Sequence, residues 1–460
     1  MKKQLLLAAL LLCFQISFGQ CPTTDIILTT QADIDNFAAN YPNCSILSHE
    51  LRVDGANNPI TNLNGLTSII EAEDIFILST QLTNLFGLDN LESVSHLALW
   101  GNQGLVDMSG LSALQSVGDL EVWVNPGIVS MDGMDNLQSL DGLNLFANNS
   151  LADISQFSFV QELHALTIGG NALTSLNGLE NLQTVLEDVT ISNEAIDDFN
   201  ELSNLHSIGG SLLLSNNPAQ DVSAFSNITN LVDLYVVECP NLMDLSGLQN
   251  VQTLSGRLRI GFNPGLTNLL EFINITSVGN LDIYENENLI SLRGLENLEV
   301  VSERLLIMDN PVLHGIESIE NVSTTDILEL VILNNASLSL CANDFVCGAL
   351  ENPAVTKTIF NNNTGCNSIA EVEAECLLLG VSDIDLTSAI NVYPNPVNEL
   401  LSIHVSDGIV FEKATVYSVL GQRLITSIEK EINMASLSQG VYFVNINTDR
   451  GTITFKLVKE

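Results

Sequence analysis

An internal repeat with a period of about 23 residues constrains the fold of this chain more than any other feature. Each period carries a short apolar step, most often Gly-Leu. The step residues are Leu66, Leu88, Leu111, Met134, Phe157, Leu179, Leu202, Phe225, Leu248, Phe272, Leu295 and Ile319. A unit of this length cannot bury its apolar edge alone, so successive units must stack. The sequence therefore predicts one elongated solenoid of about 12 coils.

Each coil also contains a short segment in which apolar residues that face the core alternate with residues that face outward. These predicted strands are Leu97–Leu99, Leu120–Val122, Leu143–Leu145, Leu166–Ile168, Leu212–Leu214, Leu258–Ile260, Leu281–Ile283 and Leu305–Ile307. Because successive side chains of a strand point to opposite faces, the first and third residues face the core. The second and fourth residues then form two columns on the outside of the solenoid.

An asparagine follows three residues after the second inward position of most strands. The column comprises Asn102, Asn125, Asn148, Asn171, Asn217, Asn263, Asn286, Asn310 and Asn335. An amide side chain both donates and accepts, so this column predicts an internal ladder that satisfies backbone groups at the corner of each coil. In the coil of Leu234–Val236 the same position holds Cys239. We expect Cys239 to be a buried, unpaired thiol and not a nucleophile.

The Gly-Leu-x-Asn-Leu steps and the Asn-Pro-Gly-Leu corners, over residues 45 to 340, make the repeat resemble the receptor L-domain type of leucine-rich repeat and its relatives in secreted proteins of the Bacteroidetes. The resemblance implies a right-handed β-helix with very short helical turns. It also implies that binding, and not catalysis, is the usual role. A fold alone does not identify a function.

The first residues have the three parts of a secretory signal peptide. Met1-Lys2-Lys3 supplies the positive charge, an apolar run follows from Leu5 to Ile16, and the small-residue end lies at Ser17-Phe18-Gly19. We expect cleavage after Gly19, so residues 1–19 are the signal peptide. No later stretch is apolar over about 18 residues, so we expect no transmembrane helix in the mature protein.

Seven cysteines remain after that cleavage, and their placement predicts disulfide-stapled caps in an oxidising compartment. Cys21 and Cys44 bracket the segment before the repeats, and we predict that they pair. Four more follow the repeats and allow three connectivities: Cys341, Cys347, Cys366 and Cys376. The predicted organisation is an N-terminal cap at 20–60, the solenoid at 61–340, a C-terminal cap at 341–376 and a linker at 377–389.

Residues 390–460 change to the alternation of antiparallel strands. We predict strands at Leu401–Val405, Ala414–Val419, Val441–Ile446 and Thr452–Val458, separated by Gly421 and Gly440, in a small β-sandwich. Motif residues in this segment are Tyr393, Pro394, Asn395 and Pro396 at its opening, then Gly421, Gly440, Tyr442 and Lys456.

With these motifs, the segment resembles the C-terminal sorting domain of the Por, or type IX, secretion system. The resemblance implies recognition by outer-membrane secretion machinery, transport to the outer surface and removal of the tail. Both release and attachment to surface lipopolysaccharide remain open.

The charge balance excludes one class of partner. With 14 basic and 55 acidic residues the formal net charge is -41, and binding to nucleic acid depends on basic side chains that displace counterions. We therefore expect no nucleic acid partner. Catalytic strings such as HExxH, GxSxG and the P-loop are absent, and no cysteine or histidine spacing fits zinc. We predict no enzyme activity, cofactor or metal.

One constellation emerges when the coils are aligned. The fourth strand position carries Trp100, Trp123 and Phe146 in consecutive coils, and the second position carries Glu121, Asn144 and Thr167. Neighbouring strands lie roughly 4.8 Å apart, so these side chains form one outward stripe. The stripe is either a binding face for a sugar or polypeptide or a stack that stabilises the solenoid. If the stripe only stabilises the solenoid, we expect the binding face to lie around Arg257, Arg259 and Arg304.

Two functions fit these features. The first is a secreted recognition or adhesion protein that binds a glycan or protein ligand on the solenoid face. The second is a ligand-presenting, non-catalytic component of a secreted glycan-degrading apparatus.

Overall fold

The computed structural model describes residues 21–379, 389–406, 409–419, 422–448 and 451–460. The chain forms two compact units, the first ending at Val372 and the second beginning at Glu373. The predicted signal peptide, Gly421 and residues 380–388 of the predicted linker lie outside the described residues.

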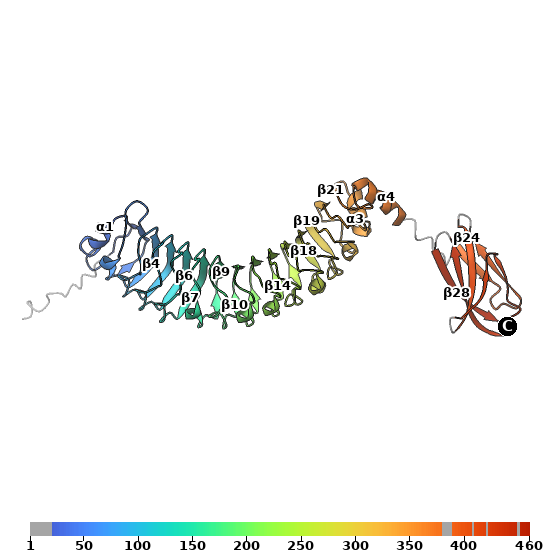
Figure 1. The fold of residues 1–460 in the computed structure, drawn as a ribbon, viewed down its shortest axis with the longest axis horizontal. Coiled ribbons are helices and arrows are strands. Elements are labelled where there is room, and N and C mark those ends of the chain that lie inside the picture. Colours follow the sequence, from blue (N-terminus) through green and yellow to red (C-terminus); the bar gives the residue numbers. More distant parts are fainter. Residues whose placement is uncertain (1–20, 380–388, 407–408, 420–421, 449–450) are drawn as a thin grey trace, which may run out of the picture. The chain divides into compact units, whose positions relative to one another are not determined.

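The first unit is a curved solenoid built on one 16-stranded parallel sheet (Figure 1). Its strands are β1 (Ile26–Leu28), β2 (Ile46–Leu47), β3 (Leu51–Asp54), β4 (Glu71–Leu78), β5 (Ser93–Trp100), β6 (Ser116–Trp123), β7 (Ser139–Phe146), β9 (Ala165–Gly169), β11 (Val189–Ser192), β13 (Leu212–Ser215), β15 (Leu234–Val237), β17 (Arg257–Gly261), β18 (Ser277–Tyr284), β19 (Val300–Met308), β20 (Glu329–Leu333) and β21 (Thr356–Phe360). Each strand pairs with the strand of the next coil, which confirms the predicted register of the repeat.

The rest of each coil is short and mostly turn. Further strands pair as β8 (Glu162–Leu163), β10 (Thr184–Val185) and β12 (Ser207–Ile208), and as β14 (Asn230–Leu231) with β16 (Thr253–Leu254). Single 3-10 turns are η1 (Asn64–Leu66), η2 (Ser155–Phe157), η3 (Asn200–Leu202), η4 (Ser223–Phe225), η5 (Leu270–Asn274) and η6 (Glu317–Ile319). The step residues of the repeat, such as Leu88 and Leu111, are fully buried. Because these residues are buried in coil after coil, the stacked coils share one continuous core. Burial of one such side chain contributes roughly 1.5 to 3 kcal/mol.

The glycine of the Gly-Leu step is required by close contact between coils. Gly294 has φ +111°, and a Cβ added there would lie 1.8 Å from the carbonyl oxygen of Leu269 in the previous coil. Gly87 has φ +115° and would place a Cβ 2.0 Å from the Leu63 carbonyl oxygen. Any side chain at these positions would force the coils apart, which explains why the step recurs as Gly-Leu.

The asparagine column forms the predicted ladder. The Asn125 Oδ1 accepts from the backbone N–H of Asn102 at 2.8 Å, and its Nδ2 donates to the Leu99 carbonyl at 2.7 Å. The same pattern links Asn125 to Asn148 and Asn286 to Asn310. Sequence analysis missed two buried members of the column: Asn362, and Asn193, which comes one residue earlier in its coil than the others.

Cys239 occupies its place in the ladder as a buried, free thiol, as predicted. Its backbone N–H donates to the Asn263 Oδ1, but its side chain offers only a sulfur atom, 3.9 Å from the Leu214 carbonyl oxygen. Burial raises the pKa of the Cys239 thiol to about 11. The thiol is therefore neutral near pH 7 and a poor nucleophile.

Disulfides close both ends of the solenoid. Cys21 pairs with Cys44, as predicted, beside α1 (Gln31–Asp35) and α2 (Phe37–Asn40). Cys341 pairs with Cys366. Cys347 and Cys376 are disulfide-bonded as well. They belong to α3 (Asp344–Glu351) and α4 (Ile369–Leu379). Among the pairings that the sequence left open, the structure gives the Cys341–Cys366 bond.

The second unit contains two antiparallel sheets. One consists of β22 (Ile390–Tyr393), β23 (Leu400–Val405) and β26 (Glu431–Asn433), and the other of β24 (Phe411–Ser418), β25 (Arg423–Ser427), β27 (Gly440–Thr448) and β28 (Gly451–Lys459). Residues of both sheets, including Leu401 and Val444, share one buried core. Gly440 is the first residue of a strand and does not separate two strands, because its backbone pairs with Lys459.

Candidate functional site

The predicted aromatic stripe lies on the outward face of the parallel sheet. Trp100 is in register with Trp123 on the next strand, and Trp123 with Phe146 on the one after. The two indoles stack with ring centroids 5.4 Å apart and an interplanar angle of 17°. Phe146 meets Trp123 edge-on at 6.4 Å. A stack of this kind contributes roughly 0.5 to 1.5 kcal/mol beyond the area it buries.

The stacking changes what the tryptophans offer to a ligand. Each indole covers a face of the other, and both tryptophans are partly buried. The Nε1 atoms of Trp100 and Trp123 are covered and have no hydrogen-bond partner within the described residues. Phe146 differs, because 46% of its surface is exposed.

One aromatic residue of this cluster escaped sequence analysis. Phe76 lies on β4 opposite Ala98 of β5, and it meets Trp100 edge-on at 6.1 Å and His96 at 5.0 Å. The Arg52 guanidinium lies 5.5 Å from the Phe76 ring centroid. A single phenylalanine outside the aligned fourth column gave no signal. Only the pairing of neighbouring strands brings it against Trp100.

The predicted polar residues lie beside the aromatic column. Glu121 is partly buried, and its Oε2 is 3.7 Å from the His96 Nε2. The Asn144 Oδ1 is covered and has no hydrogen-bond partner among the residues described. Thr167 is partly buried on the adjacent strand β9. The structure therefore gathers all six predicted site residues on one face, on strands β5, β6, β7 and β9.

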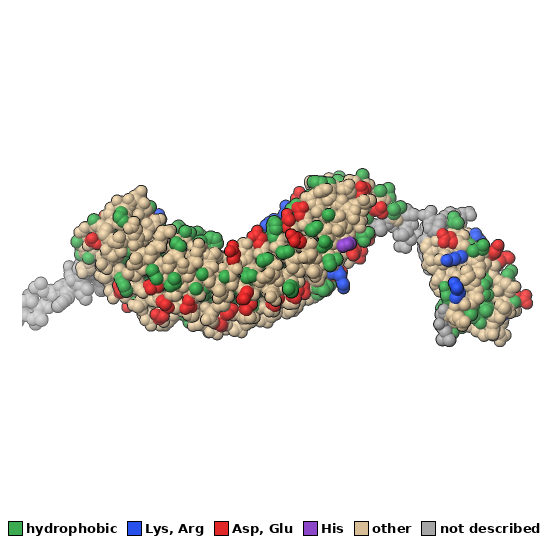
Figure 2. All heavy atoms as spheres, in the orientation of Figure 1, with side chains coloured by type: hydrophobic (Ala, Val, Ile, Leu, Met, Phe, Trp, Pro, Cys, Tyr) green, Lys and Arg blue, Asp and Glu red, His purple; other side chains and the backbone are tan. Residues whose placement is uncertain are grey.

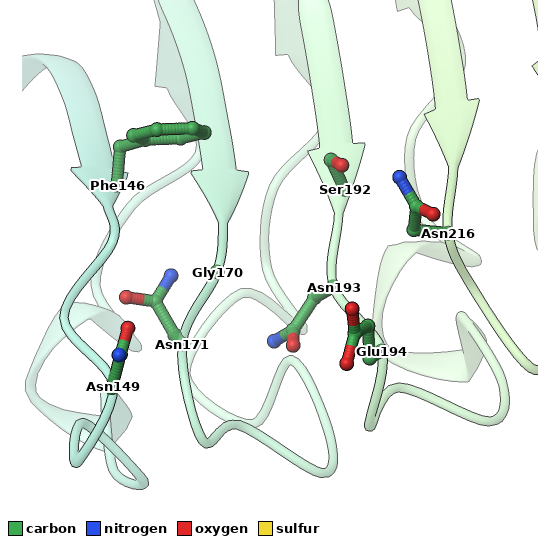
Figure 3. Close-up of a pocket in the computed structure, with 8 residues that line it drawn as sticks. All are labelled: Phe146, Asn149, Gly170, Asn171, Ser192, Asn193, Glu194 and Asn216. Carbon is green, nitrogen blue, oxygen red and sulfur yellow. The ribbon is translucent and has the colours of Figure 1, made fainter.

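Two hollows flank this face. The first, with a volume of about 360 Å³, is lined by Asp54, Ala56, Leu78, Ser79, Trp100, Gly101, Trp123 and Val124. The second, of about 430 Å³, begins at Phe146 and is lined further by Asn149, Gly170, Asn171, Ser192, Asn193, Glu194 and Asn216 (Figure 3). Both volumes lie in the range of small-molecule sites. We call the second hollow the Phe146 pocket.

The basic residues Arg257, Arg259 and Arg304 converge on one carboxylate. Asp282 is fully buried, with Arg304 Nη2 2.7 Å from its Oδ1 and Arg259 Nη2 3.1 Å from its Oδ2. The Arg257 Nε lies 3.4 Å from the same Oδ2. A buried charge needs such partners. The three guanidinium groups are therefore engaged within the sheet and do not form a free basic patch.

Tyrosines complete this arginine cluster. The Arg259 guanidinium lies 5.6 Å from the Tyr235 ring centroid and 6.0 Å from that of Tyr284. Burial raises the pKa of both tyrosines above the ordinary value. Both phenols therefore stay neutral near pH 7.

Figure 2 shows acidic side chains scattered over the visible face of the first unit, with few basic ones. Among the described residues, no group of three or more His, Cys, Asp and Glu side chains could hold a metal ion. Nor does any helix in the described ranges have the length and apolar character needed to cross a membrane.

In the second unit, Asn395 joins the two ends of the tail. Its Nδ2 donates to the Lys456 carbonyl at 2.8 Å, and its Oδ1 accepts from the backbone N–H of Val458 at 2.8 Å. Both Pro394 and Pro396 follow cis peptide bonds around it. Tyr393 ends β22 and is exposed, and the Tyr442 hydroxyl donates to the Ser438 carbonyl. Motifs far apart in sequence thus meet at the first and last strands.

Comparison with known proteins assigns this second unit. No curated protein matches the chain, and no family match supports the leucine-rich-repeat resemblance of residues 45 to 340. Residues 391–460, however, match the secretion system C-terminal sorting domain family. The protein therefore carries a type IX sorting tail, which directs it to the outer surface or the extracellular space.

Proposed function

We propose that the protein is a non-enzymatic recognition or adhesion protein, and that it binds a glycan or protein ligand on the outward face of its solenoid. The aromatic column of Trp100, Trp123 and Phe146 carries this proposal. Aromatic side chains provide contact area at low entropic cost, and the Phe146 ring of this column is exposed. We also propose that the solenoid is a right-handed, L-domain-like leucine-rich repeat, given its period and its parallel sheet.

Two observations support a binding role over a catalytic one. The single free thiol of the described residues, Cys239, is buried and its pKa is raised to about 11, so it is not activated. The outward face combines aromatic rings with amide and carboxylate groups, which suits contact with a ligand. An exported protein with such a face is suited to recognising a partner outside the cell.

The test compares outward and inward residues of the same region in the full mature chain, using a panel of polysaccharides and cell-surface proteins. Trp123→Ala is expected to weaken binding by about 1 to 3 kcal/mol, as truncation of an aromatic anchor does. Leu99→Ala is the control, because Leu99 is fully buried and its loss costs roughly 2 to 5 kcal/mol of folding free energy.

Binding isotherms and thermal unfolding are measured on both variants. A Trp123→Ala protein that melts as low as Leu99→Ala, yet binds an identified ligand unchanged, would make the tryptophan stack purely structural.

A further inference from the structure

The asparagine ladder has one irregular coil. In the other coils of the ladder a residue with positive φ stands between the fourth strand residue and the ladder position. These residues have φ between 53° and 70° and are Ser79, Gly101, Val124, Ala147, Gly170, Asn216, Glu238, Phe262, Glu285, Asp309, Asn334 and Asn361. The coil of β11 lacks this residue, so Asn193 follows Ser192 directly. Asn193 thereby reaches the ladder one residue early.

The missing residue removes hydrogen bonds that the other coils make. Each of these residues except Asn361, which follows the last strand, donates its N–H to the carbonyl of the fourth strand residue in the next coil, as Val124 does to Phe146 and Gly170 to Ser192. The Ser215 carbonyl accepts no hydrogen bond of this kind from the described residues, because the donor is missing in the coil of β11. In the regular ladder the Oδ1 of one asparagine accepts from the N–H of the asparagine before it. Among the described residues, Asn193 Oδ1 accepts no such bond from Asn171, although Asn193 is 1% exposed.

The unused groups border the Phe146 pocket. Figure 3 shows the side chains of Asn149, Asn171, Asn193 and Glu194 gathered where the strands turn, with the Phe146 ring reaching toward the next strand. A Cβ on Gly169 would lie 2.8 Å from Phe146 Cδ2, so the ring occupies space that the glycine leaves free. The Phe146 ring therefore lies over the backbone of β9 and forms one wall of the pocket.

The lining has a defined chemistry. The side chains of Asn149, Glu194 and Asn216 form no hydrogen bond or ion pair with any described residue, which leaves amide donors, amide acceptors and one carboxylate available. Phe146 supplies an exposed ring. A carboxylate without a basic partner disfavours an anionic ligand, while paired amides suit vicinal hydroxyl groups, which both donate and accept.

We propose that the Phe146 pocket binds one pyranose unit of an uncharged glycan. The C–H face of the sugar packs on the Phe146 ring, and its hydroxyls bond to Asn149, Glu194, Asn216 and the unused Asn193 Oδ1. This inference rests on the proposed function and narrows its ligand from a glycan or protein to a neutral glycan. A pyranose supplies both the apolar face and the hydroxyl pattern that the lining requires.

The test uses the full mature chain and a panel of neutral hexasaccharides built from glucose, xylose, mannose or N-acetylglucosamine, with isothermal titration as the readout. Ser192→Trp fills the pocket, and Met308→Trp is its matched control because Met308 lies in the same outward column away from the pocket. The column already carries tryptophan at Trp100 and Trp123, so both variants should fold.

At least one hexasaccharide is expected to bind the parent and Met308→Trp equally, and Ser192→Trp and Phe146→Ala at least tenfold more weakly. Glu194→Gln should also weaken binding while leaving the melting temperature unchanged. If no hexasaccharide binds the parent, or if Ser192→Trp binds as well as the parent, the inference is overturned. The proposed function survives either result if a protein or glycan ligand still depends on Trp123.

A second variant repairs the coil. One glycine inserted between Ser192 and Asn193 supplies the missing positive-φ residue and allows Asn193 Oδ1 to accept from Asn171. The variant should melt higher than the parent and lose hexasaccharide binding at least tenfold. A variant that melts higher but keeps full binding would place the glycan elsewhere.

Discussion

The coils around Asn125 and those between Asn171 and Asn263 share one architecture but differ in their ladders. Asn125 is fully buried and exchanges hydrogen bonds with Asn102 and Asn148 on either side. In the later stretch the ladder is interrupted twice, at Asn193 by a missing residue and at Cys239 by a change of side chain. In the first region every asparagine of the ladder makes its hydrogen bonds to both neighbouring coils. In the second region some polar groups at the coil corners lack these hydrogen bonds.

This difference shows what a repeat protein can vary without losing its fold. Coil stability depends mainly on contacts with the neighbouring coils, so a local defect is tolerated where the flanking apolar core is intact. Leu212 and Leu214 remain fully buried beside the irregular coil. Regular ladders therefore serve stability, while an interrupted one frees polar groups at a point where a pocket opens.

The largest expected effect separates the two regions directly. Asn125→Ala leaves buried backbone groups of Asn102 and Leu99 without partners, each costing roughly 1 to 3 kcal/mol, so we expect a loss of about 2 to 4 kcal/mol. Asn193→Ala should cost about 1 kcal/mol, because its Nδ2 makes one bond, to the Leu173 carbonyl, and its Oδ1 is unused.

Urea unfolding with hydrogen exchange measures both losses and locates them along the solenoid. Equal losses in the two variants would contradict the view that the ladder is weaker at Asn193.

A smaller effect of opposite sign is expected at the second interruption. Cys239→Asn restores an Oδ1 that can accept from the Asn217 N–H and an Nδ2 that can donate to the Leu214 carbonyl, where the thiol now lies at 3.9 Å. The gain should be roughly 0.5 to 1.5 kcal/mol. Cys239→Ala serves as the control and should lose stability. If Cys239→Asn is also destabilised, the slot has adapted to sulfur and is no simple gap in the ladder.

The smallest effect concerns the protonation of Cys239. Its folded pKa of about 11 lies above the ordinary 9.0, so the stability it contributes is present below pH 9 and is lost between pH 9 and about 11. At pH 9 the loss is roughly 0.4 kcal/mol. The free energy of unfolding at pH 7 and pH 9 is compared between the parent and Cys239→Ala. Identical pH dependence in both proteins would show that the thiol titrates normally.

Much of the solenoid was predictable because its information is local and repeated. The period gave the strands and their register, the asparagine spacing gave the ladder, and the position of Cys239 within it gave a buried free thiol. The pair Cys21–Cys44 followed from its isolation before the repeats. The tail was recognisable from motifs that the family match then supported.

The binding face was less predictable, because a one-dimensional pattern gives the side of a strand but not the orientation of a ring. Trp100 and Trp123 were placed correctly, yet their stacking on each other follows from the spacing between strands and the packing of Phe76. Asn193 escaped notice because it comes one residue early, so the alignment of the column passed over it.

By itself the sequence determined a stacked repeat, its inward and outward faces and an exported chain, since these depend on periodicity and short motifs. The tertiary structure decided that Cys341 pairs with Cys366, how three arginines share Asp282 and where the ladder breaks. These features depend on contacts between residues that are far apart in the sequence. Such contacts form only when the coils have stacked, and no local sequence pattern encodes them.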